Sequence, residues 1–386
     1  MDMRANAMVI VAVLTLASPV DVDRLVALLD LRLPARFRER IVESWLGAAQ
    51  WMPDPSFDPR AHVHRVERGS RSLESIVGEV MDKRLPRSRP LWDIHLVGGE
   101  PEALLFRAHH AMADGARLLE VLATLADEGP AQRPTPAPRP HPDIGLGRRV
   151  WAMLQGARGA AALVLRRRDP DSPLHVRLAG RKRVAISEAV DLERVMTRAH
   201  DEGGTTMAHM LAAVAEALRR SLSPWRGATL HALVPVPTAA PGEAGNRFAS
   251  VFVPLPLGES AHGARVRAID RGLARARRRA PGAARIIEAA GAAVAAIERL
   301  GVRRLSRAAS LMVSNVRGPE QRIHLASVEV TNMAAFAPSA GRISMAVTFM
   351  SYAGQLRAAV AMDERVIADP HAFAAELTKQ LEQLSH

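Results

Sequence analysis

The chain has 386 residues, 48% of them hydrophobic, and no cysteine, so it can build two ample cores but no disulfide, thiolate metal site or cysteine nucleophile. Its 52 Lys and Arg outnumber 40 Asp and Glu, and the net charge of +12 favours anionic partners. With one Tyr, eight Phe and no interleaving of basic and aromatic residues, nucleic acid is the weaker choice among them.

The longest early apolar run, Met8–Ala17, could be mistaken for a signal peptide. Ten residues are too few to span a bilayer. The next segment, Asp21–Leu33, places Leu25, Leu28 and Leu29 on one helical face. We therefore expect a core strand followed by a helix.

The stretch 45–66 contains three prolines and is expected to form loop and edge strand. A helical pattern over Leu73–Leu85 ends before Pro86, and a strand is expected over Ile94–Val97. Trp92 stands at the entry to that strand, where the default interpretation is a core aromatic.

Residues 104–122 read LLFRAHHAMADGARLLEVL and predict a strand, a turn and a helix. His109 and His110 follow the buried strand Ala103–Ala108, and Asp114 can accept the backbone N–H groups that open the helix. Adjacent residues on extended backbone point to opposite sides, so one histidine works in a given cavity while the other supports it. Neutral imidazole can take a proton near pH 7, which makes a general base plausible. The alternative is a histidine pair packed at a strand end, with Asp114 only capping the helix.

Residues 129–143 contain six prolines and predict an extended spacer. This is the expected boundary between a domain over 1–128 and one over 146–386, with 129–145 as the linker. Helices are expected over Leu146–Arg167, from Asp191, over Thr206–Leu222 and over Asp369–Leu384. The strands expected in this half are Arg183–Ser187, Leu230–Pro237, Ser250–Leu257, Leu311–Val316, Val328–Phe336, Ile343–Tyr352 and Gln355–Met362.

Four arginines, at positions 267, 271, 275 and 279, recur every four residues and fall along one helical stripe. A solvated helix face is the default interpretation. Contact with CoA phosphates or an anionic lipid is the alternative.

The H-H-x-x-x-D-G arrangement from His109 to Gly115 resembles the active-site motif of the acyl-CoA-dependent superfamily that includes chloramphenicol acetyltransferase and condensation domains. Three further segments resemble motifs of one branch, the bacterial wax ester synthase/diacylglycerol acyltransferases. They are Pro90-Leu91-Trp92, Gly245-Asn246-Arg247 followed by F-V-P-L-P at 252–256, and Ser314-Asn315-Val316 followed by Arg317-Gly318-Pro319, with Arg317 where the family has proline. The four segments stand in the family's order.

The resemblance implies an α/β fold of two chloramphenicol-acetyltransferase-like domains, each a mixed sheet flanked by helices, with a tunnel between them. It implies His110, His109 and Asp114 as the catalytic set. His110 is the expected base, while His109 and Asp114 hold the strand end and the loop. Substrate contacts are expected at six positions, namely Gly115, Trp92, Asn246, Arg247, Ser314 and Asn315.

The expected reaction joins a long-chain acyl group from acyl-CoA to a fatty alcohol or diacylglycerol, with acyl-CoA as co-substrate and neither a cofactor nor a metal. The alternatives are a related acyltransferase for a specialised metabolite or carrier-bound acyl group, and a degenerate lipid-binding member. A cytoplasmic protein is expected, attached at most peripherally to a membrane or lipid-droplet surface.

Overall fold

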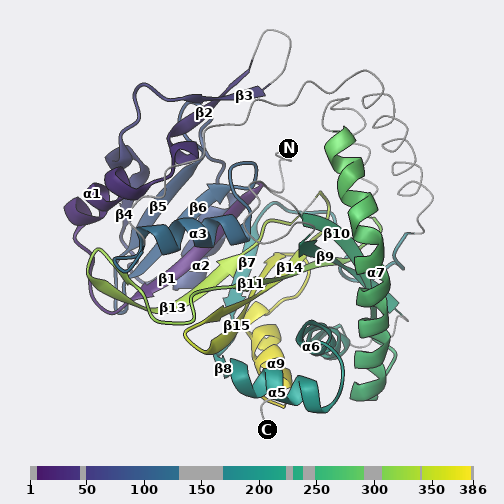
Figure 1. The fold of residues 1–386 in the computed structure, drawn as a ribbon. Coiled ribbons are helices and arrows are strands. Elements are labelled where there is room, and N and C mark those ends of the chain that lie inside the picture. Colours follow the sequence, from purple (N-terminus) through teal and green to yellow (C-terminus); the bar gives the residue numbers. More distant parts are fainter. Residues whose placement is uncertain are drawn as a thin grey trace.

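The computed structural model describes residues 7–43, 49–129, 168–222, 229–237, 248–290, 307–339 and 341–383. Within these ranges two mixed sheets are flanked by helices, as Figure 1 shows. This confirms the expected α/β class. The predicted spacer at 129–143 falls outside the described residues except for Gly129, and the predicted helix at 146–167 falls wholly outside them.

The first sheet is built around β1 (Val9–Leu16), which is buried along almost its whole length as a continuous apolar strand should be. All neighbouring strands pair antiparallel except β4 with β5. The sheet order is β12 (His324–Leu325), β13 (Val328–Phe336), β1, β6 (Ala103–His109), β5 (Trp92–Val97) and β4 (Val63–Val66). The helices of this half are α1 (Val22–Arg32), α2 (Leu73–Asp82) and α3 (Gly115–Leu125).

The start of α1 is set by Asp21, whose carboxylate accepts the N–H groups of Asp23 and Arg24. Leu25 and Leu29 are fully buried beneath it, which confirms the predicted helix and its apolar face. The stretch 45–66 contains more structure than expected. Strand β3 (Ala49–Pro53) pairs with β2 (Glu39–Glu43) as a separate hairpin, and the short helices η1 (Ala35–Arg38) and η2 (Pro59–His62) flank it.

The second sheet is also mixed, with β11 parallel to both of its neighbours. Its order is β10 (Phe248–Pro256), β9 (Thr229–Pro237), β11 (Leu311–Arg317), β14 (Met345–Tyr352), β15 (Gln355–Asp363) and β7 (Lys182–Ile186), with β8 (Val190–Asp191) also on β15. Its helices are α5 (Leu192–Asp201), α6 (Thr206–Ser221), α7 (His262–Ala290) and α9 (Pro370–Glu382). In Figure 1, α5, α6 and α9 lie below this sheet and α7 runs along its right-hand side.

Two strands from late in the chain belong to the first sheet. After β11, the chain leaves the second sheet, forms β12 and β13 beside β1, and returns as β14. The only tyrosine in the sequence, Tyr352, holds this crossover, because its hydroxyl accepts the N–H of Ile323 at 2.9 Å and donates to the carbonyl of Val330 at 2.7 Å. The predicted division at 128 and 146 stays a prediction, and the topology adds that 324–336 complete the first sheet.

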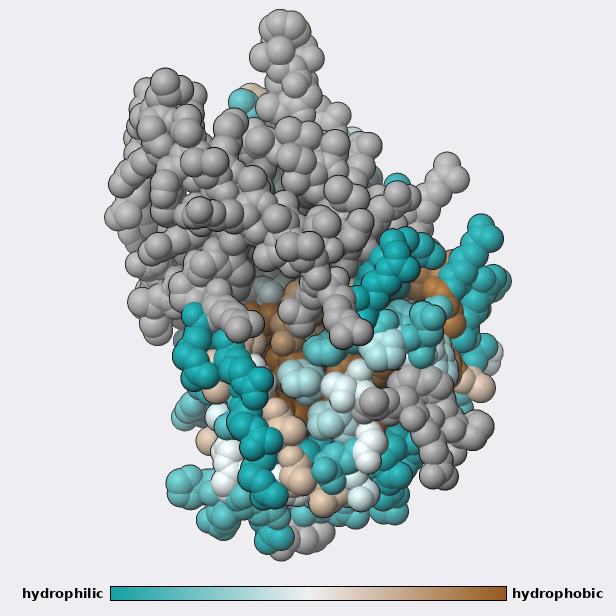
Figure 2. All heavy atoms as spheres, turned by 90° about the vertical axis from the view of Figure 1, so that its right-hand side faces the viewer, coloured by the Kyte–Doolittle hydropathy of each residue, from teal (hydrophilic) through white to brown (hydrophobic). Residues whose placement is uncertain are grey.

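The exposed face of α7 carries the predicted arginine stripe. Val266, Ile269 and Leu273 are buried, whereas the side chains at 267, 271 and 275 are exposed; that at 279 is not described. Figure 2 looks onto this side of the molecule and shows hydrophilic residues in teal over much of its described part, with hydrophobic residues between them. The default of a solvated face is confirmed for these three arginines, and a contact with phosphate or lipid stays a prediction.

A buried ion pair ties β5 to β6 beneath the histidine pair. Arg107 donates from Nε and Nη2 to the two carboxylate oxygens of Asp93, both at 2.6 Å, and its Nη1 donates to the carbonyls of Val80 and Lys83. Burial opposes the ionisation of Asp93, but the hydrogen bonds and charge of Arg107 outweigh it and hold the pKa of that carboxyl well below its usual range. Arg107, two residues before His109, is thus anchored to α2.

Replacing Arg107 with Met is expected to lower the free energy of unfolding by about 3–5 kcal/mol, because it removes the arginine charge that pairs with the buried Asp93 carboxylate and leaves only the contact with His95. The matched control is Arg117→Ala, which breaks the exposed Arg117–Glu120 pair and should cost at most about 1 kcal/mol. Urea unfolding of both variants measures the difference. Equal losses of unfolding free energy in the two variants would contradict the conclusion that the buried Arg107–Asp93 pair stabilises the fold.

Candidate active site

The H-H-x-x-x-D-G segment lies where β6 ends and α3 begins, as predicted. The turn is closed by the N–H groups of Met112 and Ala113, which donate to the carbonyl of His109. Asp114 is the N-cap of α3, and its Oδ1 accepts the N–H of Arg117 at 2.7 Å. The expected cap is confirmed, and Asp114 acts here on backbone groups.

The two histidine rings are fixed in opposite tautomers. The Nδ1 of His109 lies 3.1 Å from the N–H of Ala111 and accepts from it, so this nitrogen carries no proton. The Nδ1 of His110 lies 3.2 Å from the carbonyl oxygen of Ala113, which can only accept, so this nitrogen carries the proton. Neutral His110 therefore has its basic lone pair on Nε2, while the lone pair of His109 already accepts a backbone hydrogen bond.

The surroundings keep His110 neutral at physiological pH. Burial lowers the pKa of its imidazole, against the opposing effects of the Ala113 carbonyl and the Asp114 charge. The residue is half-buried, whereas His109 is only 8% exposed. Of the two, His110 is the one with the geometry of a general base.

The P-L-W segment lies beside the histidines through strand pairing. The carbonyl of Leu91 accepts the N–H of His109 at 2.9 Å, and Trp92 pairs with Ala108. The Trp92 ring is fully buried, stacks on His62 with centroids 4.3 Å apart and donates its indole N–H to the carbonyl of Phe37. Trp92 was predicted to contact substrate, and the structure corrects this prediction. Its side chain is fully buried in the core and is not accessible to a ligand.

The second half of the chain reaches the same motif through β11. A Cβ on Gly115 would stand 3.4 Å from a methyl carbon of Val316, about an ordinary van der Waals distance, so the start of α3 lies against β11. On this strand Ser314 is buried and donates to the hydroxyl of Thr348 at 3.1 Å, while Asn315 is exposed. Of these two predicted contacts, only Asn315 presents its side chain to solvent. Asn246 and Arg247 lie outside the described residues.

The far end of α3 is also held by the second half. Asp127 accepts the N–H of Ser327 at 2.6 Å and donates its own N–H to the carbonyl of His324 at 2.8 Å. Glu128 contacts the His324 ring at 2.5 Å. These partners were not predictable from the motif, because they lie 196 and 200 residues further along the chain.

Two protein-family models match the chain. Residues 6–157 match the wax ester synthase/diacylglycerol acyltransferase catalytic domain, and residues 244–385 match the WS/DGAT C-terminal domain. The chain belongs to this family of acyltransferases. A relative from Mycobacterium tuberculosis, described as a probable diacylglycerol O-acyltransferase, is 26% identical over 87% of this chain and 80% of its own length.

Solved structures agree on the fold of this WS/DGAT member. The wax ester synthase/diacylglycerol acyltransferase from Marinobacter aquaeolei VT8 superposes with a TM-score of 0.72 at 21% identity, covering 99% of this chain and 95% of that one. The condensation domain of the Monacolin K polyketide synthase MokA gives 0.62 at 14% identity, covering 98% and 92%. The expected two-domain relationship to condensation and acetyltransferase folds is supported.

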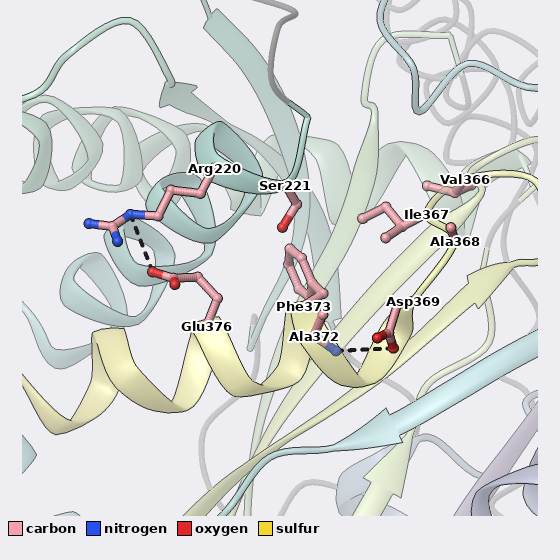
Figure 3. Close-up of a pocket in the computed structure, with 9 residues that line it drawn as sticks. All are labelled: Arg220, Ser221, Val366, Ile367, Ala368, Asp369, Ala372, Phe373 and Glu376. Carbon is pink, nitrogen blue, oxygen red and sulfur yellow. Dashed lines mark hydrogen bonds and ion pairs between the residues drawn. The ribbon is translucent and has the colours of Figure 1, made fainter.

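Among the described residues of this WS/DGAT member, a surface pocket lies away from His110, between the end of α6 and α9 (Figure 3). Its charged groups already have structural partners. Arg220 pairs with Glu376 at 3.3 Å, and Asp369 caps α9 by accepting from His371 and Ala372. We assign no chemistry to it. In the described part of the chain, no helix has the length and apolarity needed to cross a bilayer.

Because Asp114 acts on the backbone of α3, Asp114→Ser should keep the cap, whereas Asp114→Ala should lower the free energy of unfolding by about 0.5–2 kcal/mol. Urea unfolding of both variants, with acyl transfer measured on each, separates the roles. A Ser variant that is stable but inactive would show that the carboxylate itself takes part in the reaction.

The tautomers and the pKa of His110 can be read by NMR of protein labelled with 15N at histidine. His110 should carry its proton on Nδ1 and titrate below 6.5, and His109 should carry its proton on Nε2. Since only the neutral ring accepts a proton, activity should fall as the pH drops through the lowered pKa of His110. A measured pKa above 6.5 for His110 would contradict the expected effect of burial.

Proposed function

We propose that this chain transfers a long-chain acyl group from acyl-CoA to the hydroxyl of a fatty alcohol or diacylglycerol, with His110 as general base. The observation that supports this proposal is the tautomer of His110. A hydrogen bond to the Ala113 carbonyl fixes the proton on Nδ1, which makes Nε2 the nitrogen able to accept a proton.

The step we propose needs no acyl-enzyme. The acceptor oxygen attacks the thioester carbonyl carbon as its proton passes to Nε2 of His110, and a tetrahedral oxyanion forms. The carbon–sulfur bond then breaks, the ester is released, and the leaving thiolate recovers the proton from His110. General-base assistance of this kind contributes about 10²- to 10⁴-fold in rate.

Asn315 is the side chain we propose for the oxyanion pocket. It is exposed on β11, next to Val316, which contacts the start of α3. A donor at a developing oxyanion contributes about 3 kcal/mol to the transition state. Asn315 and His110 thus come from the two halves of the chain, as a site between two domains requires.

Peripheral attachment to a lipid surface is part of the proposal, because both proposed acceptors are lipids. The exposed arginines at 267, 271 and 275 on α7 would supply the electrostatic attraction to anionic headgroups.

The test is release of CoA from a long-chain acyl-CoA, measured with a thiol reagent against a panel of fatty alcohols and diacylglycerols. Because the chain has no cysteine, the reagent reports released CoA without background from the protein. We expect acceptor-dependent release that falls about 10²- to 10⁴-fold in His110→Ala and is unchanged in His371→Ala, which alters an exposed histidine on α9.

Other outcomes identify the competing functions. Activity only with short acyl donors or carrier-protein thioesters would indicate a related acyltransferase for a different substrate. Tight lipid binding without turnover would indicate a degenerate member. Equal rates for the wild type and His110→Ala would remove the histidine from the mechanism while leaving acyl transfer in place.

A further inference from the structure

Three side chains of the second half converge where α5 ends and where α6 and α7 begin. Glu202 follows α5, His209 lies in the first turn of α6, and His262 is the first residue of α7. The Nε2 of His262 is 3.4 Å from Nδ1 of His209 and 3.5 Å from Oε2 of Glu202, and the latter two atoms are 3.8 Å apart. No metal ligand was expected from the sequence, where these residues are 7 and 53 positions apart.

Two of the three converging atoms, Nδ1 of His209 and Oε2 of Glu202, are hydrogen-bond acceptors that carry no proton. The Nε2 of His209 lies 3.2 Å from the carbonyl oxygen of Gly203 and must donate to it, which leaves the lone pair of Nδ1 directed into the cluster. Glu202 accepts the Nε–H of Arg198 on Oε1 at 2.7 Å and turns Oε2 toward the histidines. Only His262 could supply a proton, and one proton cannot join both acceptors at distances longer than an ordinary hydrogen bond.

Two of the three spacings, 3.4 and 3.5 Å, are those of ligands around a metal ion, and the third, 3.8 Å between His209 and Glu202, is slightly longer. Tetrahedral bonds of about 2.0–2.2 Å from zinc to nitrogen or oxygen place neighbouring donor atoms about 3.3–3.6 Å apart. We propose that Glu202, His209 and His262 bind one Zn²⁺, with water as the fourth ligand. Two histidines and one glutamate are a ligand set that zinc accepts.

The neighbouring groups fit this assignment. The Gly203 carbonyl orients His209, and Arg198 orients Glu202, as second partners of metal ligands commonly do. Gly203 and Gly204 have φ of +75° and +110°, which allows the chain to turn sharply between Glu202 and α6. His209 is fully buried, while Glu202 and His262 are partly exposed and give the ion a path of entry.

A bound ion would join the ends of α5, α6 and α7, in addition to the Arg265–Glu216 ion pair and the Thr205–Asp270 hydrogen bonds that already link α6 to α7. None of the three ligands belongs to β6 or α3, the two elements that flank His110. The ion would therefore stabilise the second half without taking part in acyl transfer.

The experiment uses the untagged full chain, stripped of metal with a chelator and titrated with Zn²⁺ by equilibrium dialysis. We expect one tightly bound Zn²⁺ per chain, at least about 100-fold weaker binding in His262→Ala and Glu202→Gln, and unchanged binding in His200→Ala. His200 is the matched control because it is an exposed histidine at the end of α5, outside the cluster. His110→Ala should also bind Zn²⁺ normally, which keeps this test separate from that of acyl transfer.

A second readout guards against misfolded variants. His262 and Glu202 are partly exposed, so both variants should keep the metal-free circular dichroism spectrum of the wild type. Zn²⁺ should raise the melting temperature of the wild type and of His200→Ala, but of neither cluster variant. Wild-type binding no tighter than that of His262→Ala, or an equal loss in His200→Ala, would overturn the proposal.

Discussion

The placement of α3, the helix that follows the histidine pair, depends on the crossover of residues 318–336 from the second sheet to the first. Before the crossover, Val316 packs against Gly115 at the start of α3. Within it, His324 and Ser327 bind Asp127 and Glu128 just beyond the end of α3. Both ends of the helix that follows the histidine pair are therefore held by the other half of the chain. Because packed interfaces deform little, the angle of α3 is set by the relative position of the two sheets.

The histidines themselves are set by backbone groups rather than by side chains. The amides of His109 and His110 donate to the carbonyls of Leu91 and Met8, and each ring then finds a backbone partner within three residues. Such partners survive most substitutions, since every residue except proline offers the same N–H and C=O. What the local sequence must supply is a turn of the right length with small residues at 111 and 113, which allow the ring of His110 to fold back onto its own loop.

Much of this arrangement follows from local pattern. The apolar run of β1, the leucine face of α1 and the cap at Asp114 each follow from spacing and from the hydrogen-bonding capacity of one residue type. Hairpin β2–β3 was missed because three prolines within 53–59 favour a loop interpretation, whereas the pairing ends at the first of them, Pro53. Trp92 shows a different limit. A motif resemblance says that a residue recurs, but only packing against Phe37, His62 and Phe106 shows that it is a core residue.

The pairing of β1 with β13 was beyond sequence reasoning, because it joins residue 11 to residue 336 and leaves no local trace. It also bears on the order of events during synthesis. Until residue 336 has emerged from the ribosome, β1 has β6 on one side and an open apolar edge on the other, which invites pairing with another chain. The first sheet can be completed only after residue 336 has been made, so its folding must wait for strands that follow β11 of the second sheet.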